Sequence, residues 1–368
     1  MKIAIVVGTR PEIIKMSPVI RECEKRKQQN IDDSDSSFDY FILHTGQHYS
    51  YNMDKVFFEQ LNLPDAKYNL DVGSGSHGMQ TGKILAGVEE VLLKETPDVV
   101  LVQGDTNTVL AGALAASKLH IKVGHVEAGL RSYDKRMPEE INRVLADHIS
   151  DFCFAPTEQA KEILLNEGIR LENIFVTGNT IVDAVYQNLK IANKKANALK
   201  ELGLKEKEYF LVTTHRQENV DNKERFKGIL TGLQEITKEY NLPVIYPIHP
   251  RSQKMISAHN LRSDGVTLID PLDLFSFLQL EQNAKLVLTD SGGIQEETCI
   301  LGIPCVTLRD NTERPETLDV RSNMLAGVIP EDIVNCVSVM IENNKEWKNP
   351  FGDGTSGHKI IGVLEERL

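Results

Sequence analysis

The chain has 368 residues, of which 41% are hydrophobic, and a formal net charge of -12. Its length exceeds the size at which a single hydrophobic core keeps growing, so we expect two domains. The acidic balance argues against nonspecific binding to nucleic acid or to an anionic membrane, because clustered Lys and Arg side chains supply the attraction to phosphates. The composition is typical of a globular protein rather than a disordered or fibrous one.

The start of the chain and its cysteines indicate a cellular compartment. The first apolar run, IAIVV, is too short for the core of a signal peptide, and no run is long enough to cross a bilayer. The five cysteines are odd in number and lack the CxxC spacing of a zinc site, which indicates reduced thiols. We therefore expect a cytoplasmic protein without a membrane partner.

Short β-branched runs alternate with longer amphipathic runs along nearly the whole chain. This rhythm predicts parallel sheets that are buried by helices on both faces. The expected strands are KIAIVV, DYFILH, DVVLVQ, KVGHVE, DFCFAP, IFVTG, YFLVTT, VIYPIH, VTLID, KLVLTD and PCVTL.

The series of strands starts again after a polar helical stretch at residues 188–208, where a new strand begins at Tyr209. We therefore expect an α/β protein with two doubly wound domains, residues 1–174 and 175–353. Open sheets of this kind bind ligands at the carboxyl ends of their strands. A cleft between the two domains is the expected ligand site.

The first predicted strand runs into VVGTRPEIIKMSP, residues 6–18. Gly8 permits a tight turn, and the open amides of the helix that follows attract anions. Arg10 and Lys15 would add positive charge there, although two solvated surface charges would give the same pattern. Pro18 predicts a kink or a restart of the helix.

Residues 27–38 form a polar stretch that contains the triplet Asp33-Ser34-Asp35. In some transferases such a triplet holds a metal beside a nucleotide sugar. No predicted buried strand adjoins the triplet here, so we interpret it as part of a solvated loop.

Carboxylates follow two successive strands of the first domain. Asp105 comes after DVVLVQ, where it could equally cap the next helix. Glu127 directly follows IKVGHV, where a charge is costly unless it is paired or functional. Glu139 and Glu140 open a later helix, and acids are common in a first helical turn because of the helix dipole.

Two segments of the second domain also place polar groups at strand ends. His215 follows YFLVTT and could neutralise a leaving phosphate or shuttle protons. The SGG run at residues 291–293 follows KLVLTD, and its glycines let a phosphate approach bare amides at a helix start. This spacing differs from GxGxxG and from the P-loop. Glu297 could accept hydrogen bonds from a ribose, and Arg314 could help to hold the phosphates.

Several motifs at the ends of these units occur together and in order: GTRPEIIKM, GDTNT, HVEAGLRS, PEEINR, DSGGIQEE and RDNTERPE. In these motifs the chain closely resembles the non-hydrolysing UDP-N-acetylglucosamine 2-epimerases over nearly its full length. The resemblance implies two Rossmann-like domains in the GT-B arrangement. It also implies that a C-terminal helix, residues 354–368, crosses back to the first domain.

The reaction implied by the resemblance inverts C2 of the sugar and interconverts UDP-GlcNAc and UDP-ManNAc, with no metal and no redox cofactor. The C2 proton is not next to a carbonyl, so direct deprotonation is too difficult. The family instead eliminates UDP, passes through a 2-acetamidoglucal intermediate and adds UDP back. Such a site needs carboxylates near C2, cations for the departing diphosphate and a closed cleft.

The resemblance assigns roles position by position. It implies catalytic roles for Asp105, Glu127, Glu139 and His215, and it leaves open which carboxylate takes the proton. The implied binding residues are the cations Arg10, Lys15 and Arg314, the diphosphate loop Ser291, Gly292 and Gly293, Glu297 for the ribose, Phe277 for the uracil, and Leu272.

The alternative functions are a glycosyltransferase, a hydrolysing epimerase and a nucleotide-sugar sensor. A GT-B glycosyltransferase would share the nucleotide loop but would not explain the carboxylates of the first domain. A hydrolysing epimerase would release ManNAc and UDP, and a nucleotide-sugar sensor would bind without turnover.

Substrate-activated family members use a second UDP-GlcNAc site near TGQH, residues 45–48. This chain keeps TGQH and Arg216 but has no arginine in residues 70–80, so activation by UDP-GlcNAc stays open. A homodimer is expected from the family alone.

Overall fold

A computed structural model describes the chain except for residues 30–37, 48–50 and 343–345. The triplet at residues 33–35 and His48 therefore lie outside the described residues. By their contacts the described residues form two compact units, one of Met1–Tyr186 with Phe351–Leu368 and one of Gln187–Pro350. The first unit thus continues beyond residue 174, because the first half of the helix that follows its last strand packs within it.

The first unit is built on a parallel sheet whose strands pair in the order β3-β2-β1-β4-β5-β6-β7. Residues 3–7 in the first strand are at most 1% exposed, as expected for a strand that helices cover on both faces. The strands are β1 (Lys2–Val7), β2 (Asp39–His44), β3 (Tyr68–Asn69), β4 (Val99–Gln103), β5 (Lys122–Val126), β6 (Phe152–Ala155) and β7 (Ile174–Val176).

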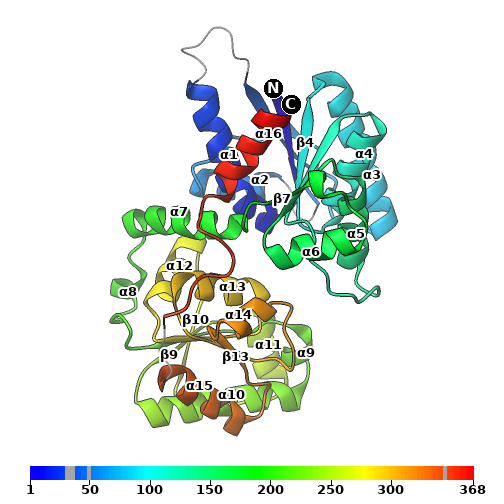
Figure 1. The fold of residues 1–368 in the computed structure, drawn as a ribbon. Helices are drawn as coiled ribbons and strands as arrows, with labels where there is room; N and C mark the ends of the chain where they lie inside the picture. Colours follow the sequence, from blue (N-terminus) through cyan, green and yellow to red (C-terminus); the bar gives the residue numbers. More distant parts are fainter. Residues whose placement is uncertain (30–37, 48–50, 343–345) are drawn as a thin grey trace. The chain divides into compact units, whose positions relative to one another are not determined.

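The helices of the first unit form layers on both faces of this sheet (Figure 1). The helices are α1 (Arg10–Gln29), α2 (Tyr51–Gln60), α3 (His77–Glu95), α4 (Asn107–Lys118), α5 (Pro138–Ile149), α6 (Glu158–Asn166), the 3-10 turn Leu171–Asn173, α7 (Thr180–Lys195), which continues into the second unit, and α16 (Ser356–Arg367). α3, α4 and α5 pack together as one layer, and α16 packs against α1 in the other.

α1 continues through Pro18 and does not restart there. A proline at this position leaves the carbonyl of Ile14 without its helical N–H donor. The hydroxyl of Ser17 donates to that carbonyl at 2.8 Å. The neighbouring side chain therefore supplies a hydrogen bond to the carbonyl that the proline leaves without a donor, and the helix continues.

α16 belongs to the first unit although it closes the chain. The backbone amides of Ser356 and Gly357, at the start of α16, donate to the buried carboxylate of Asp183 at 3.1 and 3.0 Å. A carboxylate at a helix N-terminus is favourable because the helix dipole is positive there. A Cβ atom on Gly357 would lie 2.9 Å from the carbonyl oxygen of Pro18, so only glycine allows α16 to approach α1 this closely.

The second unit repeats the same architecture, with strand order β10-β9-β8-β11-β12-β13. Its strands are β8 (Phe210–Thr213), β9 (Val244–Pro247), β10 (Val266–Ile269), β11 (Leu286–Thr289), β12 (Cys305–Thr307) and β13 (Asn323–Leu325). Its helices are α8 (Ala198–Glu201), α9 (Gln217–Val220), α10 (Lys223–Tyr240), α11 (Pro250–Ala258), α12 (Leu274–Asn283), α13 (Gly292–Leu301), α14 (Pro315–Asp319) and α15 (Pro330–Glu342).

Successive side chains of β8 enter different cores of the second unit. Phe210 and Val212 pack in one cluster with residues of α10 and α15, whereas Leu211 packs in another with residues of α12. Because side chains alternate between the faces of a strand, each face of this sheet has its own helical layer. The predicted α/β class with two doubly wound units is confirmed. In the part of the chain that the structure describes, no helix is long and apolar enough to cross a membrane.

In both sheets the order of the strands reverses next to the first strand of the unit. β1 has β2 on one side and β4 on the other, and β8 has β9 on one side and β11 on the other. Ligands of open α/β sheets bind outside the carboxyl ends of the strands at such a switch point. The segments after β1, β4, β8 and β11 are the GTRPE, GDTNT, THR and DSGG sequences, so the fold brings the motifs together in two pairs.

Candidate active site

The turns after β1 and β4 are joined by the side chain of Glu12 in the first turn of α1. One of its carboxylate oxygens accepts from the amide of Thr9 at 3.1 Å, which is the geometry of a capping box, and from the amide of Gly8 at 2.5 Å. The other oxygen accepts from the hydroxyl of Thr106 at 2.5 Å. Glu12 thus links two loops that are almost a hundred residues apart in sequence.

Glu12 is nearly inaccessible, with 2% of its surface exposed. Burial raises the pKa of Glu12 from 4.5 to about 7, against the effect of its hydrogen bonds, and the Asp105 carboxylate adds to the rise. Glu12 was not singled out from the sequence. The T-x-x-E spacing from Thr9 to Glu12 is the capping-box signal that could have found it.

A Glu12→Gln variant is expected to alter how stability depends on pH. The folded protein holds the Glu12 proton more tightly than the unfolded chain, so its free energy of unfolding falls as the pH rises from 4.5 to about 7. This loss amounts to about 3 kcal/mol. Glutamine resembles the protonated acid and has no proton to lose. The free energy of unfolding of the variant, relative to that of the native protein, should therefore rise by this amount between about pH 4 and about pH 8. Urea unfolding at both pH values measures the gain, and an equal gap at the two would contradict the raised pKa.

Position 8 requires glycine because two threonine side chains approach its backbone closely. A Cβ atom on Gly8 would lie 2.2 Å from the hydroxyl oxygens of both Thr45 and Thr108. These hydroxyls are hydrogen-bonded to each other at 2.8 Å, and the side-chain oxygen of Gln47 accepts from the amide and the hydroxyl of Thr108 at 3.0 and 2.7 Å. The polar cluster fills the space beside the turn after β1, so a larger residue than glycine does not fit.

A pocket of about 340 Å³ opens in the first unit and brings Asp105 and Glu139 together. Asp105 comes from the turn after β4, and Glu139 comes from the first turn of α5. Its other lining residues are Gln47, Ser74, Gly75, His77, Gln80, Thr106, Asn107, Pro138 and Asn142. Two of the three carboxylates predicted to act on the sugar therefore share one pocket.

Side-chain amides order the wall of this pocket. Asn107 donates to the side chain of Gln80 at 2.8 Å, and Gln80 donates to the backbone oxygen of Gln47 at 2.7 Å. Asn142 donates to the backbone oxygen of Asp105 at 2.9 Å and to the side chain of Asn107 at 3.2 Å. These amides were not singled out from the sequence, although Asn107 and Asn142 lie inside the GDTNT and PEEINR motifs.

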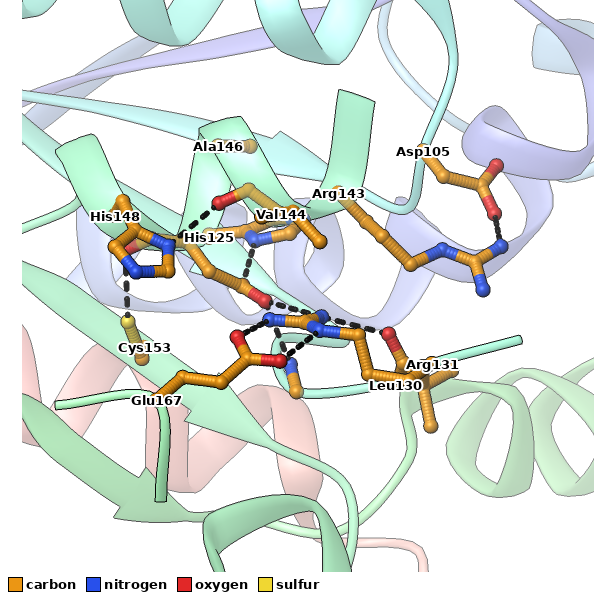
Figure 2. Close-up of polar contacts among 12 residues, drawn as sticks. Asp105, His125, Leu130, Arg131, Arg143, Val144, Ala146, His148, Cys153 and Glu167 are labelled. Atoms are coloured by element: carbon orange, nitrogen blue, oxygen red, sulfur yellow. Dashed lines mark hydrogen bonds and ion pairs between the residues drawn. The ribbon is translucent and has the colours of Figure 1, made fainter. Parts of the chain in front are cut away.

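The carboxylate of Asp105 is about one third exposed and forms an ion pair with Arg143 of α5 (Figure 2). Arg143 also lies 3.3 Å from Glu140. The Glu140 carboxylate accepts from the amides of Ser132 and Tyr133 at 2.8 and 3.0 Å. Burial alone would raise the pKa of Glu140, but these hydrogen bonds outweigh it and lower the pKa. Glu140 therefore orders the loop before α5, whereas Glu139 faces the pocket.

Glu127 is buried and paired. Lys15 lies 2.6 Å from one oxygen of Glu127, and the side-chain amide of Gln103 donates to the other. The backbone φ of Glu127 is +72°, a region that residues other than glycine adopt only at a cost in energy. Lys15, interpreted from the sequence as a cation for the diphosphate, has a carboxylate partner within its own unit. Arg10 lies over the ring of Phe57, 4.6 Å from its centre.

The second unit has a pocket of about 320 Å³ at its own switch point. It contains four residues from the sequence prediction: His215, Leu272, Phe277 and Ser291. The other lining residues are Thr213, Thr214, Pro247, His249, Pro271 and Ile294. The ring of Phe277 with the aliphatic side chains gives this pocket an apolar side, which suits a flat base.

Asp290 organises the polar side of the second pocket and was not singled out from the sequence. This fully buried carboxylate accepts from the hydroxyl of Thr214 at 2.6 Å and from the amides of His215 and Arg216 at 3.1 and 3.0 Å. The side-chain amide of Asn219 donates to it at 3.1 Å. His215 Nδ1 is 3.5 Å from Asp290, so the same group holds the backbone and the ring of His215.

The SGG run begins α13 as predicted. Ser291 is the N-cap residue, and its side chain makes no cap hydrogen bond. A Cβ atom on Gly292 or Gly293 would meet its nearest neighbours only at 3.8 Å or more. The helix therefore presents open amides beside the second pocket, the arrangement that binds anions.

Two further acids are buried, one in α13 and one in α12. Arg314 pairs with the buried Glu296 at 2.6 Å. Glu281 of α12 is fully buried, and burial together with the neighbouring carboxyl group of Glu297 raises its pKa well above the usual value. Glu297, which the sequence prediction assigned to the ribose, thus lies beside a second, buried carboxyl group. A glutamate within the apolar run FSFLQLEQ was the signal for Glu281 in the sequence.

The family model described as UDP-N-acetylglucosamine 2-epimerase matches residues 30–365. The chain belongs to the UDP-N-acetylglucosamine 2-epimerase family. The motif resemblance is thereby confirmed. The motifs therefore identified the family correctly before any site geometry was known.

Individual members of the epimerase family match over almost their whole length. A Methanocaldococcus jannaschii protein named UDP-N-acetylglucosamine 2-epimerase is 57% identical over 371 residues, 99% of either chain. A Pseudomonas aeruginosa protein named UDP-2,3-diacetamido-2,3-dideoxy-D-glucuronate 2-epimerase is 43% identical over 369 residues, again 99% of either chain. The crystal structure of the M. jannaschii UDP-GlcNAc 2-epimerase in complex with UDP-GlcNAc and UDP matches with a TM-score of 0.85 at 57% identity and full coverage of both chains.

The fold thus distributes the predicted site residues of this family member over its two units. The first unit holds Arg10, Lys15, Asp105, Glu127 and Glu139, and the second holds His215, Leu272, Phe277, Ser291, Gly292, Gly293, Glu297 and Arg314.

Proposed function

We propose that this chain is a non-hydrolysing UDP-N-acetylglucosamine 2-epimerase that interconverts UDP-GlcNAc and UDP-ManNAc. The observation that carries the proposal is the pocket of the first unit, in which Asp105 and Glu139 face the same space. Inverting C2 requires a group that removes a proton on one face of the sugar and a group that returns one on the other. Two carboxyl groups in one pocket can divide these tasks.

The reaction runs by elimination and readdition. A carboxylate takes the C2 proton while the bond from C1 to the diphosphate oxygen breaks, so UDP leaves with the bonding electrons and a C1=C2 double bond forms. A carboxylic acid then protonates C2 on the opposite face, and UDP adds back to C1. No atom is gained or lost over the cycle, and water must be kept from C1 throughout.

The two units have different tasks in this proposal. The second unit holds UDP, with Phe277 and Leu272 beside the base, Glu297 at the ribose and the open amides of α13 at the diphosphate. His215, which lines the second pocket and is held by Asp290, has the task of stabilising the leaving diphosphate in this proposal. The first unit acts on the sugar through Asp105 and Glu139. Glu127, in the turn after β5, is paired with Lys15.

The choice of sugar follows the names of two relatives. A protein named for UDP-GlcNAc is 57% identical to this chain, whereas one named for a diacetamido uronate is 43% identical. The amide-lined wall of Gln47, Gln80 and Asn107 offers neutral hydrogen-bonding groups, which suit an uncharged acetamido sugar. We therefore propose UDP-GlcNAc as the substrate. The homodimer stays an expectation from the family resemblance, and the cytoplasmic location stays a prediction from the sequence.

Incubation of the purified protein with UDP-GlcNAc in D2O, followed by proton NMR, tests the proposal. We expect UDP-ManNAc to appear with deuterium at C2. Retention of the original proton would reject the elimination. An unchanged sugar in the absence of an acceptor would point to a glycosyltransferase, and free ManNAc with UDP would point to a hydrolysing epimerase.

A further inference from the structure

A buried histidine behind the first pocket has an acceptor at each ring nitrogen. His125 in β5 is 0% exposed. Its Nδ1 is 2.6 Å from a carboxylate oxygen of Asp147, and its Nε2 is 2.7 Å from the backbone oxygen of Gly104. A carbonyl oxygen can only accept, and so can an ionised carboxylate, so both ring nitrogens must carry a proton. The geometry points to an imidazolium cation at His125.

The groups around His125 balance its charge. Asp147 of α5 also lies 2.7 Å from Arg131, which in turn lies 2.6 Å from Glu167 beyond α6. Two cations and two carboxylates therefore form one connected network, and the carboxylate of Glu127 adds to the negative field at the ring. Burial alone would lower the pKa of His125, and Asp147 outweighs it, so the pKa is raised.

The hydrogen bond from Nε2 reaches the turn that carries Asp105. Gly104 has φ +86°, and its amide donates to the backbone oxygen of Val126 at 3.1 Å. Its carbonyl oxygen is the acceptor of the His125 bond. The backbone oxygen of the next residue, Asp105, is held by Asn142. The direction in which the Asp105 side chain leaves the backbone is thus set by bonds on both neighbouring peptide groups.

We propose that His125 is a positioning residue for Asp105: its imidazolium anchors the Gly104 carbonyl and thereby aims the pocket carboxylate at the sugar. His125 is not among the described residues that line the pocket, so it acts only through the turn. The proposal rests on the proposed epimerase function, in which Asp105 exchanges a proton with C2.

Two substitutions separate the two hydrogen bonds of the ring. In His125→Gln the side-chain nitrogen takes the place of Nε2, so donation to Gly104 survives and the contact with Asp147 is lost. In His125→Asn the nitrogen takes the place of Nδ1, so the contact with Asp147 survives and the Gly104 carbonyl loses its donor. Both variants remove the positive charge, so they match in electrostatics and differ in which bond they keep. His148→Gln, on an exposed histidine of α5, is the control.

We expect kcat of His125→Asn to fall by about 10- to 100-fold with little change in KM, because a small displacement of a reacting group costs rate more than binding. His125→Gln should stay within about fivefold of the native kcat, and the control should match the native enzyme. Equal kcat values for His125→Gln and His125→Asn would overturn the proposal, because a merely structural histidine would not distinguish them.

A measurement on the native protein covers the case in which neither variant folds. Nitrogen-15 NMR of the labelled histidines should show both ring nitrogens of His125 protonated at neutral pH, and a single protonated nitrogen would overturn the proposal. This result does not depend on catalysis. An inactive native protein would instead overturn the epimerase function, so the two failures are distinguishable.

Discussion

An Asp105→Asn variant is expected to lose turnover of UDP-GlcNAc by about a thousandfold or more while it binds UDP as the native protein does. Asparagine has the size of aspartate and can still accept a hydrogen bond from Arg143, so the pocket keeps its shape. It cannot take up or release the C2 proton, however. The residues proposed to hold UDP lie in the second unit, so UDP affinity should not change.

Proton NMR of product formation and calorimetric titration with UDP measure these two quantities. Asp134→Asn is a suitable control, because Asp134 is an acid of the first unit that pairs with Arg136 and does not line the pocket. An active Asp105→Asn variant would remove Asp105 from the catalytic set and leave Glu139 as the first candidate. An equal loss of UDP affinity would mean that the substitution disturbs binding rather than proton transfer.

An Arg131→Met variant is expected to lose about 3–5 kcal/mol of stability, the usual result of removing one partner from a buried ion pair. The Arg131 side chain is 1% exposed and contacts two carboxylates, Asp147 at 2.7 Å and Glu167 at 2.6 Å. Methionine fills a similar volume without the charge. Asp147 then keeps His125 as its only cation among these residues, while Glu167, which is 27% exposed, can turn to water.

Arg136→Met is the matched control. Arg136 lies five residues further along the chain and also pairs with an aspartate, but its side chain is 90% exposed. Exposed ion pairs contribute little to stability, so this variant should unfold as the native protein does. Urea unfolding followed by circular dichroism measures both variants. An unchanged midpoint for Arg131→Met would show that the buried network contributes little to the folded state.

The two substitutions also test different parts of the molecule. Loss of activity without loss of stability is expected at Asp105, and loss of stability is expected at Arg131. His125 lies between these residues in the network and has a bond toward each side, one to Gly104 and one, through Asp147, to Arg131. The anchoring of the pocket turn is therefore connected to the most deeply buried charges of the first unit.

The sequence by itself determined the class of fold, the family and the ends of most strands, although β3 and β13 were not among the expected strands. Alternation of apolar runs with amphipathic ones is a local property, so it shows where each βα unit begins and ends. Asp105, His215 and the SGG run were placed at strand ends for this reason, and the structure has them there. The end of the first unit was harder to place, because the first half of α7 packs within that unit and the second half does not.

The tertiary structure decided which of these strand ends are neighbours. β1 and β4 are about a hundred residues apart in sequence but adjacent in the sheet, and only this order brings Glu12 to Thr106. For the same reason Lys15 pairs with Glu127, 112 residues away, and Gly8 is needed to admit Thr45 and Thr108.

The buried charges are the clearest case. Nothing in the local pattern of KVGHVE indicates that both ring nitrogens of His125 have a partner. These two partners come from the turn before α4 and from α5. Hydrogen bonds and ion pairs have a range of a few ångströms, so they depend on the packing of elements that are distant in sequence. Local patterns therefore predict the units of this protein, and the order of strands in the sheet decides the partners of its charged groups.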